Sequence, residues 1–272
     1  MRRLLLACLG LCGLAAPALA ADVAVLAPYP PPLRPLYSWT GCFIGFNIGG
    51  GAASQDFTDT VGTFVAAPGA SLGNHTGHGA VGGGQLGCDY QFNSFVFGLQ
   101  GLYDLTGMKG SNVQPDDFFY NYSFVQTLGT LTGRIGYTFT PTLLVYGRAG
   151  VARVHDLYNV QTLALSAVTG VTAFEGILQS ILGKQSIPPG TILALGSNSS
   201  TGWTIGTGFE WAFFGGDWTV FVEYDYMSFG SSRVMLLPAT VPVGPIPIDV
   251  AQRANIVLFG INYRFWSPGP KF

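Results

Sequence analysis

The chain has 272 residues, a formal net charge of −2 and 48% hydrophobic residues. Only 10% of its residues are charged, against about 25% in ordinary soluble proteins. This composition excludes a disordered chain, which needs low hydrophobicity and high charge. The composition also disfavours a nucleic-acid-binding protein, because the 12 Lys and Arg residues form no basic stripe. The 39 glycines and 14% aromatic residues favour a membrane protein built from strands rather than from helices.

The first twenty residues have the pattern of a cleaved secretory signal peptide. Arg2 and Arg3 precede an apolar stretch at 4–14, and residues 18–20 read Ala-Leu-Ala, which matches an A-x-A cleavage site. The expected order of segments therefore starts with a signal peptide at 1–20. A periplasmic linker at 21–38 follows, because its many prolines cannot pair in a central strand.

Beyond residue 20 the sequence contains no run of about 18 apolar residues free of Pro, Gly clusters or polar breaks. Helical membrane spans are therefore excluded. A hydrophobic exported chain without such spans is expected to form a closed β-barrel, because a barrel pairs every backbone N–H and C=O group without water.

Eight segments alternate apolar side chains with small or polar ones, the pattern of strands with two different faces. In 201–213, for example, Trp203, Ile205 and Trp211 share one face, whereas Thr204 and Glu210 lie on the other. The predicted strands are 40–52, 79–91, 95–106, 126–139, 143–155, 201–213, 217–229 and 254–265.

The connections between these strands alternate in length. Short ones are expected at 92–94, 140–142 and 214–216, and long ones at about 54–77, 107–124, 157–200 and 230–251. Bacterial barrels have an even number of strands, short periplasmic turns and long outer loops. The prediction is an all-β fold, an eight-stranded antiparallel transmembrane β-barrel over 39–265, with a C-terminal tail at 266–272. A soluble β-sandwich is the alternative, but it would not need aromatic side chains at both ends of its outward stripes.

Several strings, in their order and spacing, resemble a known family. They are WTGCFIGFNIGG (39–50), VFGLQGLYD (96–104), LGTLTGRIGY (128–137), GWTIGTGFEWA (202–212), WTVFVEYDYMSFG (218–230) and LFGINYRF (258–265). The sequence is similar to the alphaproteobacterial outer-membrane immunogenic proteins, porin-family barrels of the OmpA-like or opacity type. The resemblance covers nearly all of the chain after residue 20 except the long loops. It implies a protein exported to the Gram-negative outer membrane, with a structural and surface role in the envelope and pore activity disputed in some members.

The last predicted strand also resembles the signal that the outer-membrane assembly machinery reads. Gly260, Tyr263 and Phe265 carry the likeness, with aromatic residues two apart on the lipid-facing side. The sequence continues to Phe272, so either Phe265 or Phe272 could be the aromatic residue that is recognised. Phe265 is favoured, because the prolines that follow it cannot continue a central strand. Outer-membrane lipid and this machinery are the expected partners.

Charged residues lie at inward positions of the predicted strands. They are Asp89, Asp104, Arg134, Arg148, Glu210, Glu223, Asp225 and Arg264. Eight strands enclose an interior just wide enough for side chains, and an unpaired buried ion costs several kcal/mol. A polar plug that holds the barrel shut is therefore favoured over a gated ion path.

Signals for catalysis or cofactor binding are weak. The adjacent His155 and Asp156 lie near the outer rim but no serine motif accompanies them, so no enzymatic activity and no catalytic residues are expected. His75 and His78 in a glycine-rich loop are weak evidence for a metal or haem site. No Walker loop, dinucleotide fingerprint or CxxC motif occurs in the sequence, and no cofactor is predicted.

The long loops are unusually apolar. Residues 160–196 include a helical spacing of apolar side chains at 174–182, and residues 234–250 are equally apolar. Two interpretations remain open. The loops extend the strands and pack on each other, or 157–200 and 230–250 form an exposed patch for an extracellular partner.

Aromatic residues beside the short turns are expected to form a periplasmic girdle at the headgroup level. They are Trp39, Tyr90, Tyr137, Phe139, Trp211, Phe213, Trp218, Phe265 and Trp266.

Only Cys42 and Cys88 remain after signal cleavage, in a compartment where disulfides persist. Both fall near the periplasmic rim of neighbouring antiparallel strands and on the same face, where opposed Cβ atoms lie about 4.5–5.5 Å apart. In the family pattern these positions are usually aromatic, which favours pairing. The alternative is two unlinked thiols in the lipid-facing wall.

The favoured function is thus a structural and surface-exposed outer-membrane barrel. A narrow diffusion porin for small solutes is the first alternative. A surface receptor or adhesin that acts through its loops, with haem as one ligand, is the second.

Overall fold

The structure is a computed structural model that describes residues 37–62, 68–114, 119–162, 190–213, 217–239 and 244–265. The predicted signal peptide, most of the linker, the C-terminal tail and the helical spacing at 174–182 lie outside the described residues. Within them, no helix is long and apolar enough to cross a membrane.

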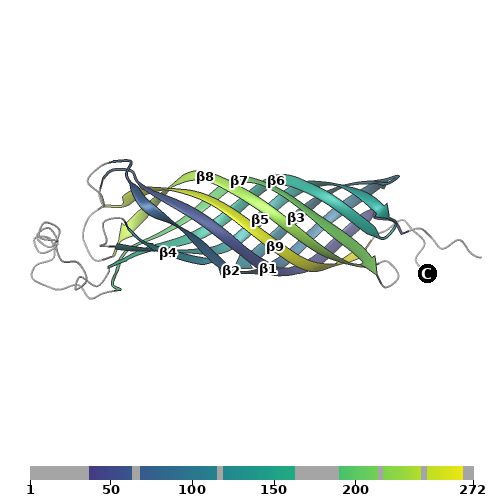
Figure 1. The fold of residues 1–272 in the computed structure, drawn as a ribbon, viewed down its shortest axis with the longest axis horizontal. Coiled ribbons are helices and arrows are strands. Elements are labelled where there is room, and N and C mark those ends of the chain that lie inside the picture. Colours follow the sequence, from purple (N-terminus) through teal and green to yellow (C-terminus); the bar gives the residue numbers. More distant parts are fainter. Residues whose placement is uncertain are drawn as a thin grey trace, which may run out of the picture. The chain divides into compact units, whose positions relative to one another are not determined.

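The described chain forms antiparallel strands that close into a barrel (Figure 1). The strands are β1 (Gly41–Asp59), β2 (Ser71–Phe92), β3 (Phe95–Thr106), β4 (Lys109–Val113), β5 (Phe119–Thr140), β6 (Leu143–Thr162), β7 (Ile192–Phe213), β8 (Trp218–Pro238) and β9 (Ile246–Phe265). β1 pairs with β9 on one side and with β2 on the other, which closes the ring.

β3 and β4 are two parts of one barrel strand. Both pair with β2 and with β5, and only Gly107 and Met108 separate them. The alternation of exposed and buried side chains continues across this gap, from exposed Leu105 through buried Met108 to exposed Lys109. The nine segments therefore make eight barrel strands, and the predicted fold class is confirmed.

The strands are longer than predicted at the ends away from the short turns. β7 starts at Ile192 and β1 ends at Asp59, whereas strands were expected at 201–213 and 40–52. The predicted long loops at 54–77, 107–124, 157–200 and 230–251 are correspondingly too long. The difference has a physical cause. At the outer end of β1, Ser54, Asp56 and Thr58 take outward positions and Phe57 points inward, so the alternation of outward apolar and inward polar residues is locally reversed.

The apolar segment 234–250 illustrates this reversal. Val234 and Leu236 on β8, and Ile248 and Val250 on β9, point into the barrel and are buried. They pack in a cluster with Phe57 and other residues at the loop end of the barrel. For the described parts of this segment, the interpretation that the loops extend the strands is therefore correct.

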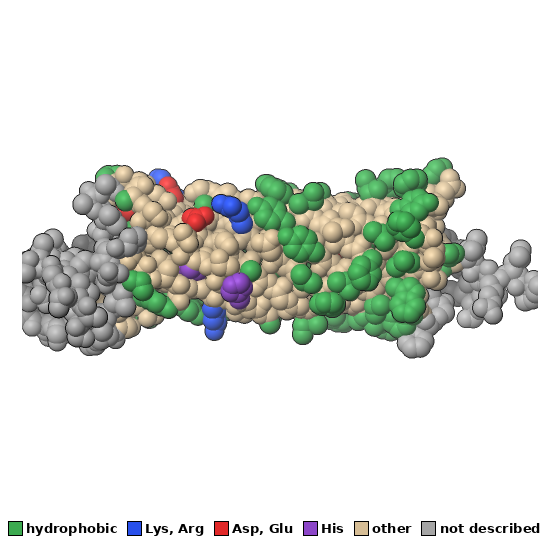
Figure 2. Space-filling view, in the orientation of Figure 1, with side chains coloured by type: hydrophobic (Ala, Val, Ile, Leu, Met, Phe, Trp, Pro, Cys, Tyr) green, Lys and Arg blue, Asp and Glu red, His purple; other side chains and the backbone are tan. Residues whose placement is uncertain are grey.

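The outside of the barrel has two zones. Toward the short turns, each strand exposes apolar side chains every second residue, as Trp203, Ile205, Phe209 and Trp211 do on β7. This stretch of β7 matches the roughly 9–11 residues that a tilted strand needs to cross a bilayer. On the face shown in Figure 2, hydrophobic side chains gather over one half of the barrel, and charged and His side chains over the other. We call the first zone the lipid belt and the second the outer wall.

The expected aromatic girdle is present at the turn end of the lipid belt, with one error. Tyr90, Tyr137, Phe139, Trp211, Trp218 and Phe265 are exposed beside the short turns or the end of β9. Trp39 is instead completely buried. Its indole Nε1 donates a hydrogen bond to the Pro141 carbonyl oxygen over 3.1 Å, because the segment before β1 folds into the barrel mouth. Trp266 lies outside the described residues.

Cys42 on β1 and Cys88 on β2 are directly opposite in the strand register. Their side chains are on the lipid-facing side of the wall, and a disulfide joins them with a Cα–Cα distance of 3.9 Å. The bridge therefore links the first two strands near the periplasmic rim.

We expect the purified, oxidised protein to show no free thiol on alkylation. Because the bridge links positions 46 residues apart, the double variant Cys42→Ser/Cys88→Ser should lose about 2–4 kcal/mol of unfolding free energy. Urea titration of the barrel in lipid vesicles measures this, with reduced wild-type protein as the comparison. Two alkylated thiols in the oxidised protein would contradict the pairing.

Candidate functional site in the barrel lumen

Four buried charges meet in the lumen just above the periplasmic mouth. Arg134 on β5 donates from Nε to Asp89 Oδ1 over 2.7 Å and from Nη1 to Glu210 Oε2 over 3.0 Å. Arg264 on β9 reaches the same two carboxylates, with Nη2 2.9 Å from Asp89 Oδ2 and 3.1 Å from Glu210 Oε1. Two cations thus balance two anions, and none of these side chains is more than 3% exposed.

Aromatic rings cover the two guanidinium groups. The Arg134 guanidinium carbon lies 4.8 Å from the centroid of Phe43 and 5.0 Å from that of Tyr146. The Arg264 guanidinium carbon lies 4.7 Å from Trp39 and 5.1 Å from Phe43. Arginine is suited to this position because its weakly hydrated, planar group stacks on rings while it binds carboxylates.

A second cluster lies beside the first and has an excess of carboxylates. Arg148 on β6 pairs with Glu223, and its Nε lies 3.1 Å from Asp225 Oδ1. The Tyr146 hydroxyl donates to Glu223 over 2.8 Å. Asp104 is fully buried in the same part of the lumen. Neither of its oxygens accepts a hydrogen bond of good geometry from the described part of the chain.

Neutral polar side chains complete the network. Thr219 and Asn262 both donate to Glu210 Oε1, and Gln85 donates to Asn262 Oδ1 over 2.6 Å. Gln100 then donates to Gln85 over 3.1 Å. Sequence reasoning did not select these residues or Tyr146. Their inward positions were the only available signal, and an inward position does not show whether a polar side chain hydrogen-bonds to the buried charges.

The predicted lumen charges are thus all inward and buried. The structure brings Asp89, Arg134, Glu210 and Arg264 into one cluster and Arg148, Glu223 and Asp225 into another, and leaves Asp104 without an ion pair among the described residues.

Apolar side chains fill the lumen on both sides of the charges. Toward the short turns, Trp39, Val96, Leu144 and Ala212 form a cluster with Tyr146. Toward the loops, Met108, Leu128 and Phe229 belong to a larger cluster. The ion pairs therefore have apolar side chains on both sides.

A hydrogen-bonded Ser–His–Asn chain lies inside the outer half of the barrel, beyond the lipid belt. His75 Nε2 is 2.6 Å from Ser123 Oγ, and His75 Nδ1 is 3.0 Å from Asn112 Oδ1. Burial lowers the pKa of His75, which favours the neutral ring. This is the connectivity of a nucleophile, a base and an orienting group. Ser123 is only 3% exposed, however, and the Phe57 ring stacks on His75 at 5.1 Å, so a substrate has no access to Ser123 Oγ.

The other histidine hypotheses fail on parity. His75 points inward and His78 outward from the same strand, so they cannot bind one metal or haem iron together. His155 is on the outer side of β6, and Asp156 is buried on the inner side. Among the described residues, no three His, Cys, Asp or Glu side chains are grouped for metal binding.

The chain is similar in sequence to known outer-membrane proteins. The family model of the outer membrane protein beta-barrel domain matches residues 4–265. Two proteins called 31 kDa outer-membrane immunogenic protein, from Brucella melitensis biotype 1 and Brucella suis biovar 1, are each 28% identical over 257 residues, 91% of this chain and 93% of theirs. The solved outer membrane protein OprG from Pseudomonas aeruginosa is 15% identical with a TM-score of 0.41, over 86% of this chain and 100% of that one.

We expect Arg134→Ala to lower the unfolding free energy by about 3–5 kcal/mol, because it leaves two buried carboxylates with one cation fewer. Urea titration of the barrel in vesicles measures the loss. Arg253→Ala is the matched control, since that side chain is 59% exposed and 3.7 Å from Asp56, which predicts a loss of under about 1 kcal/mol. Equal losses of unfolding free energy in the two variants would show that the buried ion pairs of Arg134 do not stabilise the barrel.

In contrast to Arg134→Ala, the variant Asp104→Asn is not expected to lower the unfolding free energy. It removes a buried charge that has no ion pair among the described residues, so stability should stay unchanged or rise. A fall of more than about 1 kcal/mol in the same titration would show that this carboxylate is paired and stabilising.

Proposed function

Since the chain belongs to the outer membrane protein beta-barrel domain family, it is an integral β-barrel of the Gram-negative outer membrane, and we propose that it serves there as a closed structural and surface protein rather than as a pore. The filled lumen is the observation that carries this proposal. An ion that crossed the barrel would have to displace buried ion pairs, and breaking one buried pair costs about 3–5 kcal/mol.

The charge clusters also brace the barrel across its lumen. Asp89, Arg134, Glu210 and Arg264 come from β2, β5, β7 and β9, strands on different sides of the ring. Arg148 and Glu223 add a link between β6 and β8. A barrel whose strands are joined through its interior is suited to a mechanical role in the envelope.

The outer wall supports a surface role. The strands continue well past the lipid belt, and many of their outward side chains there are polar, such as Ser54, Thr76, Ser199 and Thr201. The Brucella relatives are named as immunogenic outer-membrane proteins, and we infer a surface-exposed role for this chain. We propose no catalytic role, because Ser123 is closed to substrates.

We also propose that Phe265 is the aromatic residue that the assembly machinery reads. Tyr263 and Phe265 are exposed on the lipid-facing side of β9 at 37% and 41%. Gly260, the third residue of the proposed signal, also has a packing role, because a Cβ there would lie 2.3 Å from the ring of Phe221.

Planar-bilayer recording tests the closed lumen. We expect the purified wild-type protein to give no stable conductance steps, with an open porin of about sixteen strands as the positive control. If the wild-type protein does conduct, and the variant Arg134→Gln changes the ion selectivity of that conductance, the proposal is overturned in favour of the narrow diffusion porin.

Expression in a Gram-negative host tests the assembly signal. Phe265→Ala should reduce the amount of folded barrel in the outer membrane several-fold, whereas a chain that ends at Phe265 should insert as the full chain does. Phe259→Ala is the control, because this residue is also lipid-facing on β9 and 52% exposed. The reverse result, with the shortened chain defective and Phe265→Ala normal, would assign the signal to Phe272.

A further inference from the structure

The charges on the outer wall are distributed unevenly around the barrel. On β8, β9 and β1, Arg233 pairs with Asp249 over 2.9 Å, and Arg253 lies 3.7 Å from Asp56. On the opposite side, from β2 to β7, the outward charged side chains of the described residues are all basic. They are Lys109 and Arg153, accompanied by His78 and His155. We call these four residues the basic face.

The basic face lies directly above the lipid belt. On β6 the outward row runs from Ala149 through exposed Val151 to Arg153. Lys109 is next to Phe124 on β5, which in turn pairs with Leu157 on β6. His155 and Arg153 lie closer to the membrane along β6 than that row, and the strand tilt of about 35–45° offsets part of this difference. The four side chains therefore lie in one band of the wall next to the lipid belt.

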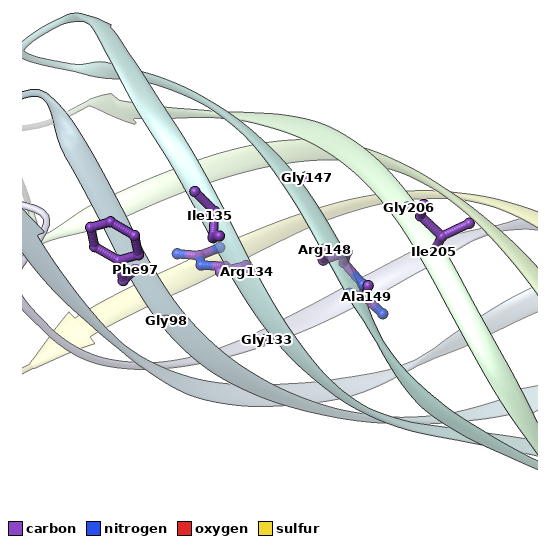
Figure 3. A pocket seen from close by; sticks show the side chains of 10 residues that line it. All are labelled: Phe97, Gly98, Gly133, Arg134, Ile135, Gly147, Arg148, Ala149, Ile205 and Gly206. Carbon is purple, nitrogen blue, oxygen red and sulfur yellow. The ribbon is translucent and has the colours of Figure 1, made fainter.

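Below the basic face, the lipid belt contains an apolar groove of about 600 Å³ (Figure 3). Phe97, Ile135 and Ile205 form its walls. Its floor is flat because Gly133 and Gly147 occupy outward positions, and a Cβ at Gly133 would meet no atom within 4 Å. Gly98, Gly206, Arg134 and Arg148 contribute backbone only, since their inward positions turn both arginine side chains into the lumen.

The groove and the basic face together match the two parts of one amphiphilic lipid, an acyl chain and a negatively charged headgroup. Along the outward row of β6, Ala149 at the groove is four residues from Arg153, about 13 Å at 3.3 Å per residue. An acyl chain in the groove would thus place its headgroup against Arg153, with His155 and Lys109 further round the wall. Lys and Arg side chains near a membrane boundary extend toward the headgroups and bind their phosphates.

We propose that this side of the barrel is a binding site for a phosphorylated lipid of the outer leaflet. The groove between β3 and β7 holds one acyl chain, and the basic face binds the phosphate. The proposal depends on the location of the protein in the outer membrane and not on the closed lumen. A conducting barrel would therefore leave it intact.

Native mass spectrometry of the full chain in neutral detergent, titrated with bisphosphorylated lipid A, tests the site. Lys109→Gln/Arg153→Gln should weaken binding about tenfold or more, because each basic residue near the surface contributes to anionic lipid binding. The matched control Arg233→Gln/Arg253→Gln removes the same charge from the paired side and should stay within about twofold of wild type. Equal weakening by both double variants, or by neither, would overturn the basic face.

The groove is tested separately. Gly133→Leu adds a side chain to the groove, at a position where a Cβ meets no atom within 4 Å, and should weaken lipid binding several-fold. Gly84→Leu is its control, because Gly84 lies in a second lipid-facing groove, of about 410 Å³, between Phe46 and Tyr103, and a Cβ there is 3.5 Å from the nearest atom. If Gly133→Leu binds as wild type does, the acyl chain is not in this groove and the proposal fails.

Two further arms identify the source of the phosphate. Lipid A without its phosphates should have the same affinity for the wild-type protein as for the variant Lys109→Gln/Arg153→Gln. Inorganic phosphate at the same concentration should not displace the lipid. If it does, the site takes free phosphate rather than a lipid. Heat-dependent gel mobility of every variant verifies that the barrel is folded.

Discussion

Closure of the sheet by the pairing of β1 with β9 is the constraint on which the rest of the structure depends. A barrel has no free edge, so each strand finds partners on both sides in a medium without water. Eight strands then set a radius that leaves room for side chains but not for a channel. The lumen must be filled, and large inward rings are accommodated beside glycine. A Cβ at Gly87 would lie 2.6 Å from the ring of Phe43, and one at Gly208 would lie 2.8 Å from that of Tyr146.

The same radius explains why so many ions are buried. Guanidinium groups reach across the lumen, and one arginine bridges carboxylates from strands that are not neighbours. Arg134 on β5 does this between Asp89 on β2 and Glu210 on β7. Apolar layers above and below remove water from these pairs, which strengthens their attraction and makes the loss of one partner costly.

Much of this architecture was predictable from the sequence, because the period of two assigns each residue of a lipid-facing strand to one side. The inward positions of the lumen charges and the facing cysteines follow from that parity. The partners of each charge do not, since they depend on the stagger of strands around the ring. Trp39 was misplaced because it precedes β1, where parity no longer applies. The outer parts of β1 and β7 were missed because the wall there faces water, and the pattern changes phase.

The length of the strands has a consequence for the loops. β7 has 22 residues, of which about 9–11 are needed to cross the bilayer. The remainder, at about 3.3 Å per residue and a tilt near 40°, raises the loop ends by about 25–30 Å above the lipid surface. The loops are thus attached to an outer part of the barrel that has its own buried apolar cluster. Changes in loop sequence are separated from the embedded part, so the loops can diverge while the membrane-spanning part of the barrel stays the same.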